Sequence, residues 1–82
     1  MKVYVLKDPY FDFIYGVFTT TEAAEKDAIS HAEHHPRFNQ LSVQRVGDLE
    51  QQYDFTVRLG CEDQDGYYDY EQTYTITAFE LQ

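Results

Sequence analysis

Hydrophobic and polar residues alternate along most of the chain, a pattern typical of β-strands that bury one face. In residues 53–59, Tyr, Phe, Val and Leu fall on one face and Asp, Thr and Arg on the other. Alternation over residues 67–81 predicts a long final strand, which either bends or divides into two. Its predicted core face holds Tyr68, Tyr70, Tyr74, Ile76 and Ala78, and its outer face Asp69, Glu71, Thr73, Thr75 and Thr77. Shorter strands are predicted over residues 2–7, 12–19 and 41–46.

One segment has helical spacing instead. Its apolar positions repeat at the interval of one helix face and comprise Ala24, Ala28, Ile29 and Ala32. Thr19 and Glu22 fit a capping box at its start, with Thr20 or Thr21 as alternative N-caps. Pro36 predicts that the helix ends before it. Because the apolar side chains are small, we expect the helix to lie close against a sheet whose aromatic side chains supply the volume.

The elements therefore follow the order β-β-α-β-β-β. This order predicts a single α+β domain over residues 1–82, an antiparallel sheet with one helix packed on it. Asp8-Pro9 is a turn signal between the first two strands, which we expect to form a hairpin. Gly47-Asp48 is predicted to end the third strand, and residues 60–66, GCEDQDG, to form a polar loop. Gly16 predicts a bulge or a close backbone approach in the second strand.

Acidic residues are distributed unevenly along the chain. Residues 48–82 hold nine carboxylates and one base, Arg58, and so carry net −8 of the chain's −9. Residues 1–47 nearly balance, with six acids and five bases. At 43% hydrophobic and 17% aromatic, the chain is too apolar for an acidic disordered segment. We therefore expect the negative charge to lie on a folded surface.

Composition also limits the function classes. Cys61 is the only cysteine, which fits a reducing compartment. The absence of a long apolar run and of a signal-peptide pattern predicts a cytoplasmic protein. Direct binding to nucleic acid or to a membrane is not expected, because no basic patch is present to replace phosphate counterions. No serine-nucleophile or phosphate-loop motif is present, and acidic neighbours disfavour a reactive Cys61 thiolate, so we expect no enzyme.

The acidic outer surface of the last two strands and their connecting loop is the leading candidate site. Carboxylates on alternate residues of one strand face lie about 7 Å apart, a spacing that can imitate duplex phosphates. A partner with a phosphate-binding groove offers Arg side chains to pair with them. A surface that only maintains solubility, the alternative, usually mixes both signs of charge. The predicted partner-binding residues are Asp54, Glu62, Asp63, Asp65, Asp69 and Glu71, with Tyr67 as an aromatic anchor.

The acidic loop also resembles a calcium loop in part. Asp63, Asp65 and Gly66 fit positions 3, 5 and 6 of an EF-hand. Cys61 and Gln72 then occupy the positions of the first ligand and the bidentate glutamate, so the match fails. We therefore expect no cofactor and no metal at this loop.

Three histidines form a second candidate metal site. His31, His34 and His35 have the i, i+3 and i+4 spacing that can hold Zn²⁺ or Ni²⁺ on a helix face, although a site needs further ligands. Histidine is also favourable near a helix C-terminus, where its charged form meets the negative end of the helix dipole. Both interpretations stay open at this stage.

The segment VYVL…YGVFTTTEAAEKDAI resembles the opening of small bacterial and phage domains. Those domains run strand, G-V-F/Y, two or three Ser/Thr, then E-x-A-E-x-A-I, which matches residues 3–6 and 16–29 here. The motif mainly describes a strand followed by a helix cap and assigns no activity. As a whole, a small acidic single-domain chain is similar to phage-encoded anti-defence inhibitors, including DNA mimics and anti-CRISPR proteins. That resemblance implies an inhibitory function and carries over no residue.

The sequence thus predicts a non-enzymatic acidic protein. It is expected to bind a basic nucleic-acid-handling protein or complex and to block that partner's nucleic-acid site. The first alternative is an interaction or assembly module that forms a homodimer through a sheet edge. The second is a metal-binding regulatory domain that uses His31, His34 and His35.

Overall fold

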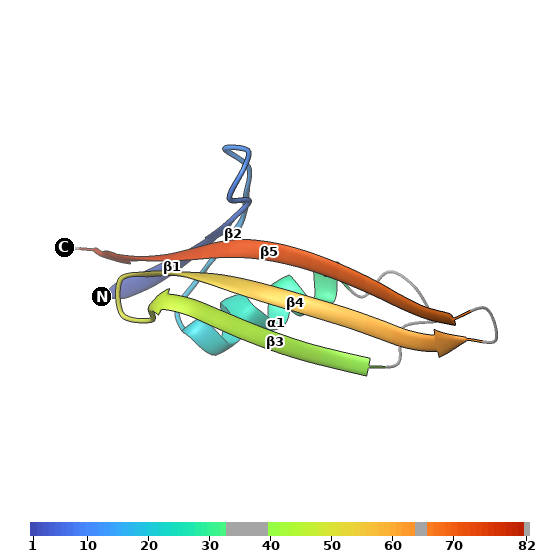
Figure 1. Ribbon diagram of the computed structural model, residues 1–82. Coiled ribbons are helices and arrows are strands. Elements are labelled where there is room, and N and C mark those ends of the chain that lie inside the picture. The colour runs from blue at the N-terminus through green and yellow to red at the C-terminus, as the bar shows by residue number, and fades with distance from the viewer. Residues whose placement is uncertain (33–39, 64–65, 82) are drawn as a thin grey trace.

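The computed structural model describes residues 1–32, 40–63 and 66–81, with the backbone alone for residues 62, 63 and 66–68. The elements in Figure 1 are β1 (Lys2–Lys7), β2 (Ile14–Phe18), α1 (Thr21–Ala32), β3 (Gln40–Asp48), β4 (Gln52–Asp63) and β5 (Gly66–Glu80). The strands form one five-stranded sheet in which every pair is antiparallel. In the described part of the chain, one helix packs on this sheet, as expected for the α+β class.

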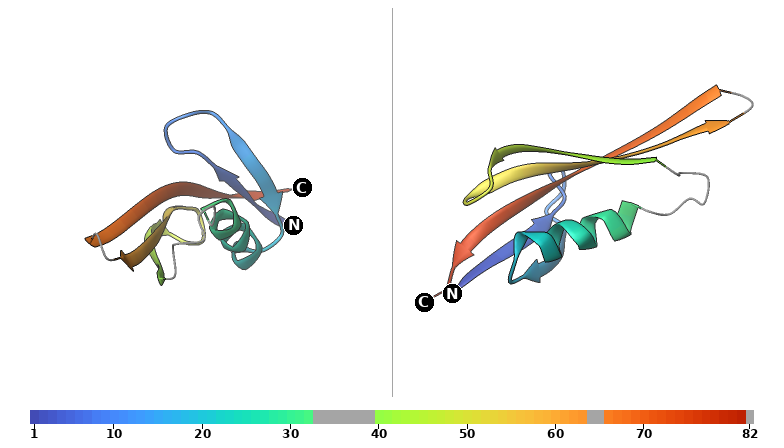
Figure 2. Two further views of the ribbon diagram at one scale, coloured as in Figure 1. Left: turned by 90° about the vertical axis from the view of Figure 1, so that its right-hand side faces the viewer. Right: turned by 90° about the horizontal axis from the view of Figure 1, so that it is seen from below.

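The order of the strands across the sheet is β2-β1-β5-β4-β3. It differs from the order along the chain, because β5 lies between β1 and β4 and joins the β1–β2 hairpin to the β3–β4 hairpin. The sheet curves around α1, which packs on β1, β2, β4 and β5 (Figure 2). The molecule measures 54 × 22 × 20 Å, because the β4–β5 hairpin continues past the end of α1 (Figures 1 and 2).

The core lies between α1 and the concave face of the sheet. From α1 it contains Ala24, Ala28 and Ala32, and from the strands Leu6, Tyr53, Phe55, Val57, Leu59, Tyr74 and Ile76. The small helix side chains allow a close approach, while three aromatic and four aliphatic side chains of the sheet fill the space. The predicted alanine-rich helix face is therefore confirmed, but the opposing sheet face is as much aliphatic as aromatic.

Thr20 is the N-cap of α1. Its Oγ1 accepts a hydrogen bond from the backbone N–H of Ala23 at 3.1 Å, the bond expected between an N-cap and the third helical residue. The predicted capping box of Thr19 and Glu22 is wrong, since the helix begins at Thr21, one residue later than that box requires. Glu22 instead lies in the first turn, where a carboxylate interacts favourably with the helix dipole. The predicted helix end before Pro36 falls outside the described residues.

The polar loop predicted for residues 60–66 is wrong. The β4–β5 ladder continues through this segment, with Gly60 opposite Asp69 and Asp63 opposite Gly66. Polar side chains do not end a strand whose backbone groups pair with a neighbour, and this explains the error. Cys61 is consequently buried in β4, at 3% exposure, rather than placed in an acidic loop. The final strand neither divides nor stops and runs for 15 residues.

The predicted alternation of β5 holds for its core face near α1 but fails at Tyr70 and at Thr75. Tyr74 and Ile76 are buried on the core face, whereas Tyr70 is 37% exposed and donates its hydroxyl proton to Gln72 Oε1 at 3.1 Å. Thr75, predicted to face solvent, is only 4% exposed. Its hydroxyl donates to Asp54 Oδ1 at 3.0 Å. Thr75 is covered because its side chain is short and β5 lies between two other strands, β1 and β4. The side chain of Tyr68 lies outside the described residues.

The β1–β2 hairpin contains the predicted irregularity. Its register shifts between Leu6, which faces Gly16, and Lys7, which faces Ile14, so Tyr15 is the bulged residue. A Cβ at Gly16 would lie 2.9 Å from the ring of Phe18, so the close approach at this glycine comes from a side chain rather than from the predicted backbone. β2 is shorter than predicted, because its first residues belong to the loop that follows β1.

β3 ends at Asp48, two residues later than predicted, so the turn follows the Gly47-Asp48 signal instead of containing it. Both residues belong to β3 and face Tyr53 and Gln52 of β4. Asp48 closes the turn, since its Oδ1 accepts from Glu50 N at 2.9 Å and its backbone oxygen from Gln51 N at 3.0 Å. Gly47 has φ +126°, and a Cβ there would lie 2.7 Å from the backbone oxygen of Gln52.

We predict that Gly47→Ala destabilises the fold. The substitution forces an L-residue into a positive-φ conformation against the β4 backbone, a cost of about 1–3 kcal/mol. Urea denaturation should show the lower midpoint, with Ser42→Ala on the same exposed strand as the control, expected within about 0.5 kcal/mol of the parent. Equal midpoints for the two variants would contradict the strain argument.

Candidate functional site

Three of the predicted acidic residues occupy the sheet face away from α1. Asp54 in β4 and Asp69 and Glu71 in β5 are all exposed. Glu71 lies opposite Arg58, whose Nε and Nη2 both donate to its Oε2, at 3.1 and 2.7 Å. Asp69 lies opposite Gly60, so the residue directly across from it in β4 has no charged side chain. The structure therefore places these carboxylates on the predicted face and pairs one of them with a base.

The remaining predicted residues lie near the tip of the β4–β5 hairpin. Glu62 and Asp63 end β4, and the backbone of Tyr67 is opposite that of Glu62. Their side chains, and Asp65 as a whole, lie outside the described residues. The rise of an antiparallel strand gives the spacing of these carboxylates along the hairpin. Asp54 lies about 13 Å along β4 from Arg58, the residue opposite Glu71, and Glu71 lies about 7 Å along β5 from Asp69.

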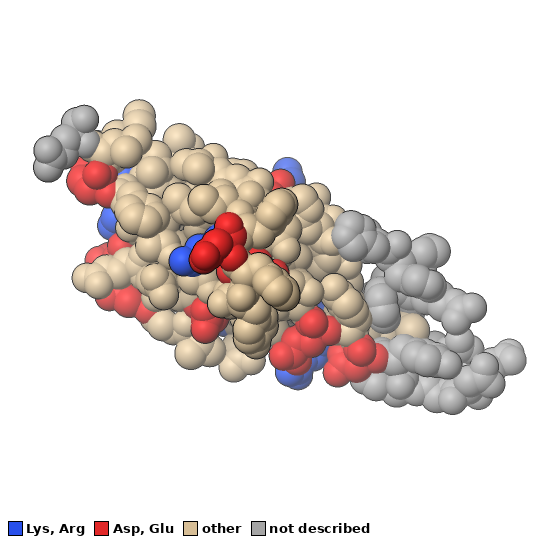
Figure 3. Space-filling view, turned by 90° about the horizontal axis from the view of Figure 1, so that it is seen from above, with Lys and Arg blue, Asp and Glu red and all other residues tan. Residues whose placement is uncertain are grey.

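On the face of the molecule drawn in Figure 3, the acidic side chains of the described residues lie in several separate groups with other side chains between them. The charge is instead ordered along the hairpin. In its distal part, from Arg58 to Gln72, the chain contains five acids and one base. The candidate interface is thus a narrow acidic arm rather than a broad negative surface.

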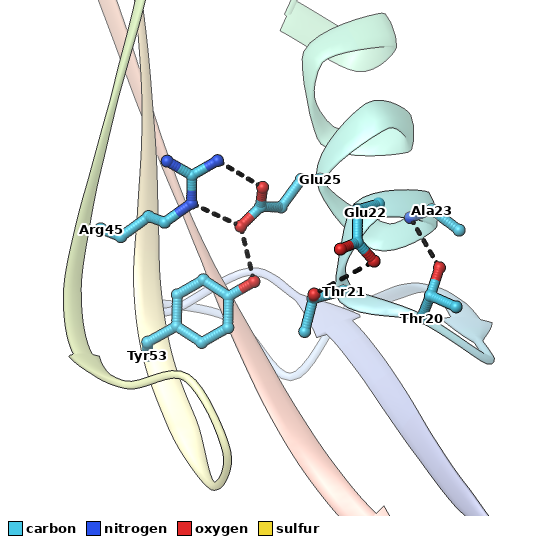
Figure 4. Close-up of polar contacts among 7 residues, drawn as sticks. All are labelled: Thr20, Thr21, Glu22, Ala23, Glu25, Arg45 and Tyr53. Atoms are coloured by element: carbon cyan, nitrogen blue, oxygen red, sulfur yellow. Dashed lines mark hydrogen bonds and ion pairs between the residues drawn. The ribbon is translucent and has the colours of Figure 1, made fainter.

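A buried polar cluster joins α1 to β3 and β4, and sequence patterns did not reveal it. Arg45 of β3 donates from Nε and Nη2 to the two carboxylate oxygens of Glu25, at 2.8 and 2.6 Å (Figure 4). The hydroxyl of Tyr53 donates to Glu25 Oε2 at 2.7 Å. The guanidinium carbon of Arg45 also lies 5.4 Å from the centre of the Phe55 ring. We call Glu25, Arg45 and Tyr53 the Glu25 cluster.

The Glu25 cluster holds its carboxylate in the charged form. Burial by itself raises the pKa of Glu25, but the hydrogen bonds from Arg45 and Tyr53 favour the carboxylate and hold the pKa below its ordinary value of 4.5. Burial and the bond to Glu25 raise the pKa of Tyr53, so its hydroxyl keeps its proton and donates it. The bond to Glu25 likewise raises the pKa of Arg45. The cluster is satisfied internally, which suits a structural role better than a catalytic one.

The loop between β1 and β2 presents an aromatic surface that was also missed. Tyr10, Phe11 and Phe13 are 84%, 74% and 58% exposed. The loop is nevertheless well formed, because Asp8 Oδ1 accepts from the backbone N–H groups of Tyr10 and Phe11, at 2.8 and 3.1 Å. Asp8 N donates to the backbone oxygen of Phe13 at 2.9 Å. Three aromatics within four residues of a turn signal were the clue in the sequence.

The histidine hypothesis gains no further ligand from the structure. His31 Nε2 lies 3.0 Å from Asp27 Oδ2, and its ring lies 5.0 Å from that of Tyr15. Among residues 1–32, 40–63 and 66–81, no three His, Cys, Asp or Glu side chains come together in a metal-binding arrangement. His34 and His35 lie outside the described residues, so the predicted site stays a prediction.

Comparison with known proteins gives no family. No protein-family model, curated protein or solved structure matches the chain. Within the part of the chain that the structure describes, no helix is long and apolar enough to cross a membrane. Two surface features remain from which to infer a function, the acidic arm and the aromatic loop between β1 and β2.

We predict that Arg45→Met destabilises the protein by about 1–3 kcal/mol, because it leaves the buried Glu25 carboxylate without its main partner. The matched control is Arg58→Met. That substitution breaks an Arg–Glu pair whose side chains are both 50% exposed, so it should cost about 0–1 kcal/mol. Denaturant unfolding at neutral pH distinguishes the two, and equal losses would contradict the buried role of Glu25.

The Glu25 cluster also predicts an acid dependence. A carboxyl whose pKa is lower in the folded protein than in the unfolded chain stabilises the fold above the unfolded value, and this contribution is lost as the pH falls through the folded pKa. The unfolding free energy should therefore drop below pH 4.5, the ordinary value for Glu25. Glu25→Gln should be less stable at neutral pH and should lose less on acidification. Parallel pH profiles for the two proteins would rule this out.

Proposed function

We propose that this chain is a non-enzymatic protein that binds a basic nucleic-acid-handling protein and blocks its nucleic-acid site. The supporting observation is the charge of the β4–β5 hairpin. Its distal part, from Arg58 to Gln72, contains five acids and one base and forms the acidic arm. Beyond Gly60 and Asp69 the arm consists of β4 and β5 alone, and a segment two strands wide can enter a groove that a broader domain cannot.

The arm has carboxylates available for a partner's arginines. Asp69 on the arm and Asp54 on the same sheet face are exposed, so each can pair with a cationic side chain of a groove that covers it. The Arg58–Glu71 pair does not prevent such binding. An exposed ion pair contributes only about 0–1 kcal/mol, so a partner's arginine can replace Arg58 at Glu71 at small cost.

The aromatic loop provides apolar contact area for the same partner. Tyr10 and Phe11 are large, exposed and held by Asp8, so little conformational entropy is lost when they are covered. Asp8 and Asp12 keep the loop acidic, which suits a basic partner. Aromatic side chains of this kind are frequent interface anchors.

Affinity capture from bacterial lysate tests the proposal. Raising salt from about 0.1 M to about 1 M shortens the Debye length from about 10 Å to about 3 Å and should release the captured protein. Added duplex DNA should also release it, because the arm and the DNA compete for one groove. The triple variant Asp54→Asn, Asp69→Asn, Glu71→Gln should capture less, and so should Glu62→Gln, Asp63→Asn, Asp65→Asn.

The matched control removes the same charge from other exposed positions. It combines Glu22→Gln, Glu50→Gln and Glu80→Gln, and it should capture the partner nearly as well as the parent. Capture that is indifferent to salt would exclude charge mimicry. A control that loses as much as the arm variants would show that only net charge matters, and would exclude the arm as the binding site.

A further inference from the structure

β3 is an outer strand of the sheet with one paired edge. All nine residues from Gln40 to Asp48 pair with β4 in an unbroken register, and all nine are exposed. Among the described residues, no strand pairs with the opposite edge of β3. Alternate backbone N–H and C=O groups along this edge therefore point outward and can pair with another strand.

This edge lacks the usual protection against pairing. Outer strands are commonly blocked by proline, lysine, a bulge or short length, and the sequence QLSVQRVGD provides none of these. Its one basic residue, Arg45, is directed inward to Glu25 and does not guard the edge. β2, the other outer strand, has five residues and the bulge at Tyr15. β3 is therefore the edge on which a further strand fits.

Apolar side chains flank the β3 edge on both faces. Leu41 and Val43 lie on the face that carries α1, yet they are 50% and 37% exposed, because β3 lies outside the area that α1 covers. Val46 lies on the opposite face and is 58% exposed. A strand added at this edge would cover apolar surface on both faces in addition to pairing its backbone.

The charge pattern of β3 fits a second copy of the same strand. β3 contains one base and one acid, Arg45 and Asp48, so the edge is locally neutral in a chain of net charge −9. In an antiparallel pair centred on Gln44, Arg45 faces Val43 of the other copy and Asp48 faces Gln40. No two charges of the same sign meet, and the two Gln44 amides can bond to each other.

We propose that two copies of this chain pair antiparallel through β3, about a two-fold axis at Gln44, so that their sheets become one continuous sheet. This association does not involve the tip of the acidic arm. The tip lies at the end of β4 and β5 that is far from the β3–β4 turn, and it stays exposed in the pair. The association also predicts a salt response opposite to that of the arm. Two chains of net charge −9 repel each other, and salt screens that repulsion, so added salt should strengthen the pair.

Equilibrium sedimentation of the purified chain tests the proposal. The mass should rise toward that of two chains across the micromolar range and should do so at lower protein concentration when salt is added. A single-chain mass throughout the micromolar and low millimolar range would overturn the proposal and leave the β3 edge for a different protein.

Charge substitutions at Gln44 locate the contact. Gln44→Lys and Gln44→Glu each place like charges opposite one another and should weaken the dimer by up to about fivefold, the effect of one like-charge pair across two strands. An equimolar mixture of the two should restore it, and Gln44→Ala should leave it near the parent value. Gln44 is exposed, so these variants should fold. A dimer that neither charge weakens would show that the copies meet elsewhere and would equally overturn the proposal.

Discussion

The carboxylate of Glu25 is the interaction on which the arrangement of the elements most depends. The buried face of α1 is otherwise made of alanines, which pack closely but give little directional information. Glu25 receives hydrogen bonds from two strands that follow it by 20 and 28 residues, and so fixes the helix against β3 and β4 together. Removing one member leaves a buried charge or hydroxyl without its partner, which costs more than the satisfied cluster contributes. The same bonds direct Arg45 toward Glu25 and away from the free edge of β3, so an internal contact determines a property of the surface.

Much of the core was predictable because burial imposes a period on the sequence. Alternation over residues 53–59 identified the buried face of β4, and the spacing of Ala24, Ala28 and Ala32 identified that of α1. Glu25 was missed because a glutamate is ordinarily assigned to solvent. Its position three residues before Ala28 places it on the edge of the apolar stripe, which was the available signal. The strand order across the sheet depends on pairing between distant segments, and local patterns contain no information about it.

The candidate site was predictable in composition but not in geometry. Counting charges located the acids on the last two strands, and alternation assigned Asp54, Asp69 and Glu71 to the outer face. The ion pair between Arg58 and Glu71 depends on the register of β4 against β5, which places these two residues opposite each other. A loop assigned to residues 60–66 concealed that register, since polarity was taken as the end of a strand. The exposed aromatics were overlooked because hydrophobic side chains are usually expected inside.

The central position of β5 has a consequence for how the chain assembles. The last strand in the chain order is the one that links the β1–β2 hairpin to the β3–β4 hairpin, and Lys2 finally lies opposite Glu80. Until residues 66–80 have left the ribosome, the two hairpins share no strand and α1 has no continuous sheet to cover. The domain therefore closes only after nearly all of these residues have been synthesised. Contacts between its two ends make folding slower than in a helical protein of the same length.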